Sequence, residues 1–417
     1  MIDAPARAEG LVVRRLPAFA LAAFLLLAVV VGVVASLAYP GRPELGLDGP
    51  WWLDALFQGD SGWYFSIASQ GYSYTPGVQS PIAFFPAYPV TVHLLGELMG
   101  GDFSTAAGVL TLVFAGAVTV LFASWIRTRV APRTAVVAVG LLLLYPYSFF
   151  LYGSGYSDAL FLLTALGAFA LLERRQYVLA GLVGILATAG RPIGIAVTAG
   201  LAVRALELLA QRRTAQHDPD PDPDPDRAGA GSPGRPVPLR ALVAALRDVG
   251  WREVSLLVSV AGLVGWMVYL GERFGDPLAF ATVQGAPGWN QGSGPFTWFK
   301  GPFVGSVLSL DWDVLVLIVP QALMCGLAVL LVRTCWKRFG WGYTAFAVVS
   351  IAIPIIGTKD FMGGGRYVLA AFPLLAAAAV VLTGDRRPRW LAPAVLAVLG
   401  VGLVIATVAY VHGVEVS

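Results

Sequence analysis

Long apolar runs recur along the chain and are separated by short polar or basic stretches. A run of about twenty residues forms a helix that can cross the roughly 30 Å hydrocarbon core of a bilayer. The runs are continuous rather than alternating, which excludes a closed β-barrel. The pattern predicts an all-α, polytopic membrane protein with eleven transmembrane helices. The predicted spans cover residues 16–39, 105–126, 134–152, 157–172, 177–190, 192–210, 252–271, 312–333, 341–357, 366–383 and 390–411.

The apolar segment Phe84–Met99 decides the topology. Counted as a further span, it would invert the five helices that follow and place basic clusters outside, against the positive-inside rule. As a re-entrant or interfacial helix, it leaves the N-terminus and every basic cluster on the cytoplasmic side, and we predict this arrangement. The clusters are Arg127, Arg129 and Arg133; Arg174 and Arg175; Arg204, Arg212 and Arg213; Arg333, Lys337 and Arg338; and Arg386, Arg387 and Arg389.

The composition agrees with a membrane protein. Hydrophobic residues make up 57% of the chain and charged residues 13%, whereas soluble domains are about a quarter charged. The formal net charge of +3 gives no sign of a nucleic-acid partner. The one plainly polar stretch alternates Asp with Pro over residues 218–226 and cannot bury a core. We predict an N-terminal transmembrane part over 1–210 with an extracytoplasmic loop at 40–84, a disordered cytoplasmic linker over 211–250, and a C-terminal transmembrane part over 251–417 with an extracytoplasmic loop at 272–311.

Asp60 is the most informative polar residue of the predicted outer face. It follows the first span and stands among Trp63, Tyr64 and Tyr72, and aromatic rings favour the level of the lipid headgroups. A carboxylate at that depth can act as a general base on the hydroxyl group of an acceptor. The simpler alternative is that Asp60 only caps a helix beginning at Ser61.

Three cations on the predicted outer face, Arg191, Lys359 and Arg366, run against the charge bias of the chain. A phosphate group is bound by a forked guanidinium or by an ammonium. We therefore predict that these three side chains bind the phosphate of a lipid donor. The simpler alternative for Arg191, which precedes Pro192, is that it marks the membrane boundary. Cations alone can neutralise a lipid phosphate leaving group, so this chemistry requires neither a metal ion nor a cofactor.

The other polar and aromatic residues of the outer face are predicted to contact substrate. For Asp276, which precedes a proline, turn initiation is the simpler interpretation. Asp54 is interpreted as solvated or structural, and His93 as a packing residue. The predicted substrate contacts are Trp63, Tyr64, Tyr72, Asp158, Asp276, Gln284 and Tyr367.

The combination of a carboxylate, outward cations and a lipid-embedded surface favours glycosyl transfer from a lipid phosphate sugar. A transporter or lipid flippase is the main alternative, because such proteins carry charged residues in broken helices near the bilayer midplane. Here the charges gather at one predicted surface, and the two halves of the chain show no convincing repeat. A membrane scaffold without enzymatic activity is the third alternative, and it leaves the outer residues without a purpose.

Several short motifs share the pattern of one known family. They are Asp60, Tyr64, Ile67-Ala68, Gly71-Tyr72, Phe84-Phe85-Pro86 and Tyr88-Pro89; Ser157-Asp-Ala-Leu-Phe161; Leu179-Ala-Gly-Leu182; Arg191-Pro-Ile-Gly194; Gly275-Asp-Pro-Leu-Ala-Phe280 with Gln284 and Trp289; and Gly365-Arg-Tyr-Val-Leu369 with Phe372-Pro373. On these residues the chain resembles the PIG-V-type mannosyltransferases, that is GPI mannosyltransferase II and its relatives in the GT-C class of glycosyltransferases. The resemblance covers nearly the whole chain outside the linker. It departs from the family at Asp158, where a Glu is usual, and at Gly190, where a Thr or Ser is common.

The resemblance implies an inverting transfer of mannose from a β-linked polyprenyl-phosphate mannose, with Asp60 as the base. The implied partners are this donor lipid, the surrounding membrane lipids and an acceptor. Eukaryotic members act in the assembly of glycolipid anchors. The composition, rich in Ala, Gly, Val and Arg, resembles actinobacterial members, which implies a bacterial plasma membrane with the active site on its extracytoplasmic face. The acceptor is then an envelope glycolipid, glycan or protein.

Overall fold

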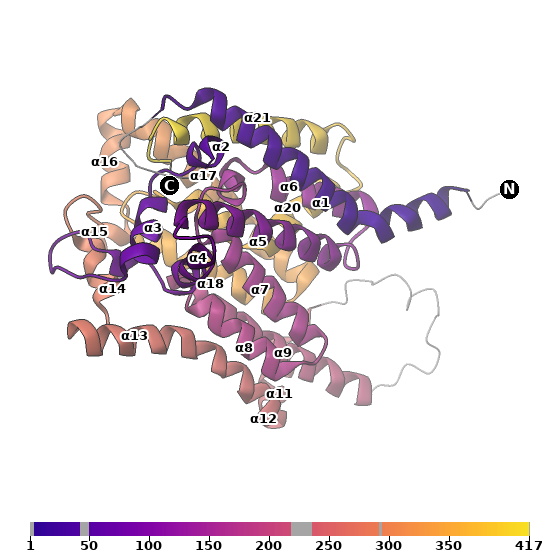
Figure 1. The fold of residues 1–417 in the computed structure, drawn as a ribbon. Coiled ribbons are helices and arrows are strands. Elements are labelled where there is room, and N and C mark those ends of the chain that lie inside the picture. Colours follow the sequence, from indigo (N-terminus) through magenta and orange to yellow (C-terminus); the bar gives the residue numbers. More distant parts are fainter. Residues whose placement is uncertain (1–3, 42–49, 218–235, 292–293, 417) are drawn as a thin grey trace.

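Helices build the described part of the molecule. The computed structural model describes residues 4–41, 50–217, 236–291 and 294–416. Within these ranges the elements are α-helices and short 3-10 helices, and there is no strand. In Figure 1, α1 (Ala4–Ala38) and α21 (Leu391–Val411) lie at one edge of the bundle and α13 (Ala261–Phe274) at the opposite edge.

Within the described residues, six helical segments are long and apolar enough to cross a membrane. They are Arg14–Ala38 of α1; α5 (Phe103–Ile126); Pro192–Thr214 in η4 (Pro192–Gly194) and α9 (Ile195–His217); Trp251–Phe274 in α12 (Trp251–Val254), η6 (Ser255–Val260) and α13; α17 (Trp312–Phe339); and α21. A seventh results if α19 (Gly364–Ala370) and α20 (Phe372–Leu382), which meet at 84°, form one span. The prediction of a polytopic helical membrane protein is confirmed.

The other predicted spans coincide with shorter helices, which are α6 (Pro132–Leu144), α7 (Asp158–Glu173), α8 (Tyr177–Thr188) and α18 (Trp341–Gly357). Each of the eleven predicted segments therefore contains a helix, and the count of eleven crossings stays a prediction. The remaining short elements are α2 (Trp51–Asp54), α3 (Ser61–Gln70), η2 (Pro81–Ala83), η3 (Pro146–Leu151), α11 (Leu239–Ala245), η5 (Leu246–Asp248), α14 (Ala279–Thr282), η7 (Val283–Gly285), α15 (Pro295–Trp298) and α16 (Gly301–Ser309).

Two predicted spans are interrupted by proline. The predicted helix over 134–152 ends at Leu144, because Tyr145 precedes Pro146 and takes an extended backbone with ψ 136°. The predicted helix over 366–383 bends at Ala371, since Pro373 has no N–H to donate to the carbonyl four residues before it. The second bend places the short helix α19 at an angle to α20, and α19 carries Arg366.

The ambiguous segment forms α4 (Ala87–Leu98), a helix of 12 residues. At 1.5 Å per residue it is about 18 Å long, well short of the roughly 30 Å hydrocarbon core. It packs against α3 and α5, and its first N–H, that of Ala87, donates to the carbonyl of Ala189 at 2.9 Å. These features support a re-entrant or interfacial helix, which stays a prediction.

The predicted disordered linker over 211–250 includes residues that are helical near both of its ends. Helix α9 continues to His217, and α11, a helix of seven residues, begins 13 residues after Asp226 and packs back onto α9. Val237 and Leu242 are buried against Leu209, and the carbonyl of Val237 accepts a hydrogen bond from the Trp341 indole at 2.7 Å. Residues 218–235 of the predicted linker lie outside the described residues.

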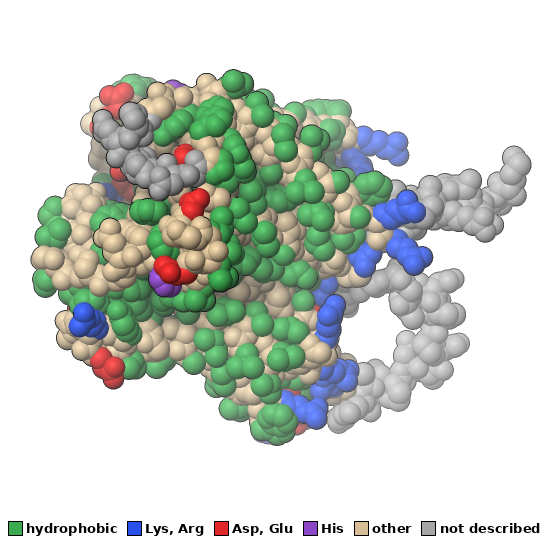
Figure 2. All heavy atoms as spheres, viewed as in Figure 1, with side chains coloured by type: hydrophobic (Ala, Val, Ile, Leu, Met, Phe, Trp, Pro, Cys, Tyr) green, Lys and Arg blue, Asp and Glu red, His purple; other side chains and the backbone are tan. Residues whose placement is uncertain are grey.

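The predicted cytoplasmic clusters meet at one end of the bundle. A guanidinium N–H of Arg127 donates to the carbonyl of Arg14 at 3.0 Å, which joins α1 to the C-terminal end of α5. Arg133 donates to the carbonyl of Arg389 at 3.2 Å, which joins α6 to the segment before α21. Figure 2 shows Lys and Arg side chains gathered at the end of the molecule from which α1 begins. The grouping follows the positive-inside pattern, although which side of the membrane it faces stays a prediction.

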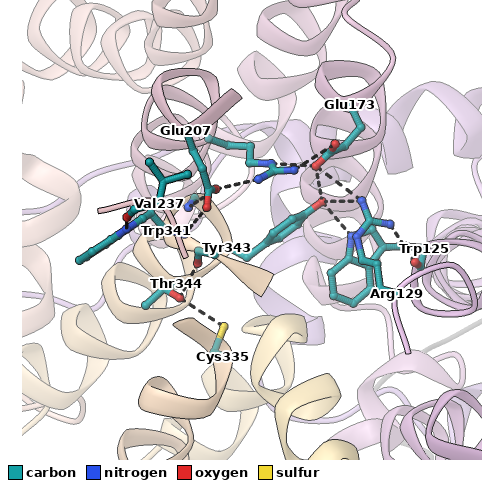
Figure 3. Close-up of polar contacts among 12 residues, drawn as sticks. Trp125, Arg129, Glu173, Glu207, Val237, Cys335, Trp341, Tyr343 and Thr344 are labelled. Carbon is teal, nitrogen blue, oxygen red and sulfur yellow. Dashed lines mark hydrogen bonds and ion pairs between the residues drawn. The ribbon is translucent and has the colours of Figure 1, made fainter. Parts of the chain in front are cut away.

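An ion-pair network fastens α5, α7, α9 and α18 at this end (Figure 3). Glu173 accepts hydrogen bonds from Arg204 at 2.9 Å and from the Tyr343 hydroxyl at 3.0 Å, and it pairs with Arg129 at 3.5 Å. Arg204 also donates to Glu207 at 2.7 Å, whose carboxylate accepts the N–H of Trp341 at 3.0 Å. Every carboxylate of the network has cationic or N–H partners, so the network is structural and needs no ligand.

Candidate active site

The predicted outer residues gather at the end of the bundle opposite to this network. Helix α7 separates the two, because Asp158 begins it and Glu173 ends it. Fifteen helical steps of 1.5 Å place these two residues about 22 Å apart along the axis. The polar groups described next gather around the Asp158 end of α7, away from this network.

Asp60 is held by a turn whose backbone is bonded to distant tyrosines. The Tyr156 hydroxyl accepts the N–H of Asp60 at 2.8 Å and lies 3.2 Å from the carbonyl of Gln58, to which it donates. The Tyr410 hydroxyl donates to the same carbonyl at 2.7 Å. Gly59 has φ 59°, and a Cβ there would lie 2.8 Å from the Tyr156 oxygen, so the turn requires glycine.

The capping alternative for Asp60 does not describe its side chain. Asp60 is the residue before α3, but its carboxylate makes no capping hydrogen bond. It instead accepts a hydrogen bond from Arg366 Nη1 at 3.1 Å. These two residues are 306 positions apart in the chain, so only the packing of α19 against the first loop brings them together.

Asp60 and Arg366 form the exposed end of a row of four alternating charges. Arg366 Nε lies 3.7 Å from Asp158 Oδ2, and Asp158 Oδ1 accepts a hydrogen bond from Arg191 Nη1. The exposed fraction of the side chain falls from 29% at Asp60 to 12% at Arg366 and 2% at Asp158. Arg191 also lies over the Tyr367 ring, 4.9 Å from its centroid. The buried Asp158–Arg191 pair therefore lies directly behind Arg366, the arginine that faces Asp60.

Two cavities meet at Asp60. The larger has a volume of about 720 Å³ and is lined by charged groups, Asp60, Arg191 and Arg366, and by apolar groups that include Phe280 and Ile353. The smaller has a volume of about 340 Å³ and is lined mainly by polar residues, which include Gln58, Gln79, Lys359 and Asp360. Both cavities share Asp60, Trp289, Gln291 and Met362 in their walls. A group bound in either one can reach the Asp60 carboxylate.

Aromatic rings form the wall beside Asp60. Trp63 stacks on Phe84 with ring centroids 5.9 Å apart and meets Trp289 at 5.7 Å. Tyr64 meets Phe84 edge to face at 5.1 Å, and its hydroxyl lies 2.7 Å from Ser157 Oγ. Burial raises the pKa of Tyr64 well above its usual range, and the nearby Arg191 and Arg366 only partly offset this. Tyr64 therefore stays a neutral phenol at neutral pH.

Of the predicted substrate contacts, four line the cavities. Trp63 lies in the wall of the smaller cavity, and Tyr64, Gln284 and Tyr367 lie in that of the larger. The predicted phosphate ligands are divided: Arg191 and Arg366 line the larger cavity, whereas Lys359 lines the smaller. Lys359 and the arginine pair therefore line different cavities, which adjoin at Asp60.

Three predicted substrate contacts have other roles. Asp158 is fully buried between Arg191 and Arg366, and it lines neither cavity. Tyr72 packs against Trp266 and donates its hydroxyl to the carbonyl of Phe84 at 2.9 Å. Asp276 is exposed and accepts the N–H of Leu278 at 2.8 Å, which is the turn geometry named as its alternative. In the structure the first is an ion-pair partner, the second a packing residue and the third a turn former, and their roles as substrate contacts stay predictions.

Sequence reasoning missed the residues that fix the Asp60 turn. Tyr156 and Tyr410 lie far from Asp60 in the chain, within or beside apolar runs, so no local pattern distinguishes them from core tyrosines. Gln58 lies two residues from Asp60, is 5% exposed and lines the smaller cavity. Its amide nitrogen has no hydrogen-bond partner in the described structure. The one signal available in the sequence was that Gln58, which carries an amide group, lies two residues before the predicted base Asp60.

No histidine or cysteine of the described residues lines either cavity. Among the described residues, no group of three or more His, Cys, Asp or Glu side chains could hold a metal ion. Cys325 and Cys335 are free and buried. His93 bonds the carbonyl of Ala68 at 2.7 Å through Nδ1 and stacks on Phe103, contacts that agree with its interpretation as a packing residue.

No protein-family model matches this chain, and no curated protein matches it. The solved structures that match include the oligosaccharyltransferase of Archaeoglobus fulgidus with a tethered acceptor peptide, at 14% identity and a TM-score of 0.41, over 94% of this chain and 55% of that one. They also include the archaeal oligosaccharyltransferase AglB from Archaeoglobus fulgidus with an inhibitory peptide and a dolichol-phosphate, at 12% identity and a TM-score of 0.40, over 94% of this chain and 56% of that one. This chain spans about half the length of those proteins. Likeness at this level assigns no activity.

Proposed function

We propose that this protein is a membrane glycosyltransferase of the GT-C type, which moves a sugar from a polyprenyl-phosphate carrier to a hydroxyl group of an acceptor. One observation carries the proposal: Asp60 lies in the wall shared by two cavities, with Arg366 at 3.1 Å and a buried arginine–aspartate pair behind it. A transfer reaction needs a separate place for donor and acceptor and a base where they meet.

The larger cavity suits the donor. Its charged wall holds Arg366 and Arg191, and its apolar wall holds Phe280, Ile353 and Pro354, so a phosphate and the start of a hydrocarbon chain both find suitable surroundings. Arg191 Nη2 and Arg366 Nε have no hydrogen-bond partner in the described structure. Guanidinium groups stabilise the charge that develops on a departing phosphate.

The smaller, polar cavity suits the acceptor. The acceptor hydroxyl attacks the anomeric carbon, the bond from that carbon to the phosphate oxygen breaks, and its electron pair leaves with the phosphate. Asp60 takes the hydroxyl proton as general base, and the arginines hold the lipid phosphate as it gains charge. Attack from the cavity opposite to the phosphate inverts the configuration at the anomeric carbon.

The choice of mannose rests on the resemblance to PIG-V-type enzymes. The motif residues Phe84, Arg191, Gln284 and Arg366 all line the larger cavity, which supports reading these motifs as parts of one site. An extracytoplasmic site in a bacterial plasma membrane belongs to the same proposal. The transporter alternative requires charged groups near the bilayer midplane. In this protein the row of charges includes Asp158, the first residue of α7, and so lies at the opposite end of that helix from Glu173.

A transfer assay with the purified protein tests the proposal. The protein in detergent receives polyprenyl-phosphate mannose, radiolabelled in the sugar, together with an envelope lipid and glycan extract, and labelled products are identified. The same assay with polyprenyl-phosphate glucose tests the sugar.

We expect Asp60→Asn to lower transfer by about 100-fold or more, because the amide cannot take the proton. Its folding should change little, since the Asp60–Arg366 pair is partly exposed and such pairs contribute roughly 1 kcal/mol or less. Asp54→Asn is the matched control, a nearby carboxylate on α2 outside both cavities. Near-normal turnover by the Asp60→Asn variant would remove this residue as the base.

A further inference from the structure

Lys300 is a buried cation that the proposed chemistry does not use. It lies between α15 and α16, is 7% exposed and has a left-handed backbone with φ 57°, which is uncommon for a residue other than glycine. Its ammonium donates to the carbonyl of Thr358, the C-terminal cap of α18, and lies 3.4 Å from the Thr358 hydroxyl. The last carbonyl groups of a helix have no backbone N–H partner within the helix, and here the Lys300 ammonium supplies the missing hydrogen-bond donor.

The loop after Thr358 closes over the Lys300 side chain. The Phe361 ring lies 4.8 Å from the Lys300 ammonium and meets Phe303 of α16 edge to face at 5.2 Å. Phe361 also has a left-handed backbone, with φ 69°. Burial lowers the pKa of Lys300, and the carboxylate of Asp360 partly offsets this. Backbone strain of this kind persists only where surrounding contacts hold it in place.

This loop in turn holds the wall that the two cavities share. The N–H of Lys359 donates to the Gln291 side-chain oxygen at 3.2 Å, and the Lys359 ammonium lies 3.5 Å from the carbonyl of Trp289. Trp289, Gln291 and Met362 are three of the four residues common to both cavities, the fourth being Asp60. Chain continuity extends the same loop to Arg366 in the first turn of α19.

We propose that Lys300 is a positioning residue, whose contacts with Thr358 and Phe361 hold the shared wall against Asp60 and so limit the access of water to the donor. The expected effect of Lys300 on transfer and hydrolysis rests on the proposed function, whereas its effect on the position of the wall does not. Lys300 touches neither cavity and acts through residues 358–362.

Lys300→Met tests the contact, because methionine keeps an apolar stem of similar length and removes the donor. We expect transfer to fall about 10-fold, since small misplacements near a reacting centre cost that much or more. Hydrolysis of the donor to free sugar should fall less or rise, because a loosened wall admits water. The hydrolysis-to-transfer ratio therefore increases several-fold. Lys300→Arg, which retains donors for the carbonyl, should restore most of the ratio.

The matched control is Lys337→Met, an exposed lysine in the last turn of α17. A purely structural role for Lys300 would lower transfer and hydrolysis together and leave their ratio unchanged, and that result would overturn the proposal.

A second measurement does not depend on activity. Hydrogen–deuterium exchange followed by mass spectrometry should show faster exchange in peptides covering residues 284–291 and 358–363 of Lys300→Met, and not of Lys337→Met. Unchanged exchange in both peptides would overturn the positioning role even if transfer falls. Faster exchange in a protein that transfers no sugar from any polyprenyl-phosphate donor would support the contact and refute the proposed function.

Discussion

Replacing Asp158 by Asn should unbalance the buried half of the charge row. Asp158 is 2% exposed and pairs with Arg191, which is 4% exposed, and with Arg366 at 3.7 Å. Asparagine keeps the shape and one acceptor oxygen but removes the charge. Among the contacts described above, Arg191 then has no carboxylate beside it, and the Tyr367 ring is the remaining group that attracts its charge. A buried cation without a counter-charge is strongly destabilising.

The expected loss is about 3–5 kcal/mol, the usual cost of removing one partner from a buried ion pair. Glu173→Gln at the opposite end is the matched control. Its pair with Arg129 has both side chains about one quarter exposed, and Arg204 keeps Glu207 as a partner. Because of solvent screening and this second partner, we expect Glu173→Gln to lower the free energy of unfolding by only roughly 1 kcal/mol. The difference between the two variants therefore comes from burial rather than from the number of ion pairs.

Thermal unfolding in detergent, followed by near-ultraviolet circular dichroism, measures the two losses side by side. The double variant Asp158→Asn with Arg191→Met removes both charges and should regain part of the lost stability, because no unpaired buried cation remains. Donor binding should stay weak in the double variant, since one of the two arginines of the larger cavity is gone. If Asp158→Asn melts no lower than Glu173→Gln, or if the double variant is less stable than Asp158→Asn, the buried charge row is not what stabilises this end of the protein.

Two further substitutions test single contacts. Arg366→Lys should weaken donor use less than Arg366→Ala does, because an ammonium keeps the charge but cannot fork onto two phosphate oxygens; donor titration at saturating acceptor measures this, and a shift in acceptor dependence alone would assign Arg366 to the acceptor. Asp102→Ala should cost about 1 kcal/mol, since Asp102 caps α5 by accepting the N–H of Thr105 at 2.9 Å. Burial raises the pKa of Asp102, but hydrogen bonds from Thr105 and Ser104 outweigh this and lower it below its usual 3.8. The cap's charge-dependent contribution is therefore present above pH 3.8 and is lost as the pH falls through the lower folded value. Melting curves of wild type and variant should converge only in strong acid, and a gap that persists there would contradict the role of the carboxylate charge.

Hydropathy and charge pattern predicted the class of fold because each is a property of residues that are close together in the chain. The free energy of moving a side chain into hydrocarbon belongs to that residue and its neighbours, so long apolar runs become helices wherever they pack. Each predicted span accordingly contains a helix, and hydrogen bonds join Arg127 to Arg14 and Arg133 to Arg389 at one end. The same pattern did not locate the interruptions at Pro146 and Pro373, since hydropathy is blind to the missing N–H.

The candidate site was only partly predictable, for a related reason. Asp60 could be found from its aromatic neighbours, and Arg366 and Arg191 from their place on the predicted outer face, where cations are unexpected. Which charges pair could not be found, because Asp60 and Arg366 are 306 residues apart. The sequence likewise left Asp158 and Gln284 as equal candidates, whereas packing buries the first and places the second in a cavity wall.

The sequence by itself therefore determined that this chain is a helical membrane protein, where its long apolar helical segments lie, and which residues are chemically able to act. Tertiary structure alone decided that two cavities meet at Asp60, that tyrosines 156 and 410 hold its turn, and that Lys300 closes on Thr358. The physical reason is range. Transfer free energies and helix breaks act over a few residues, whereas ion pairs and cavity walls depend on how helices distant in the chain pack together.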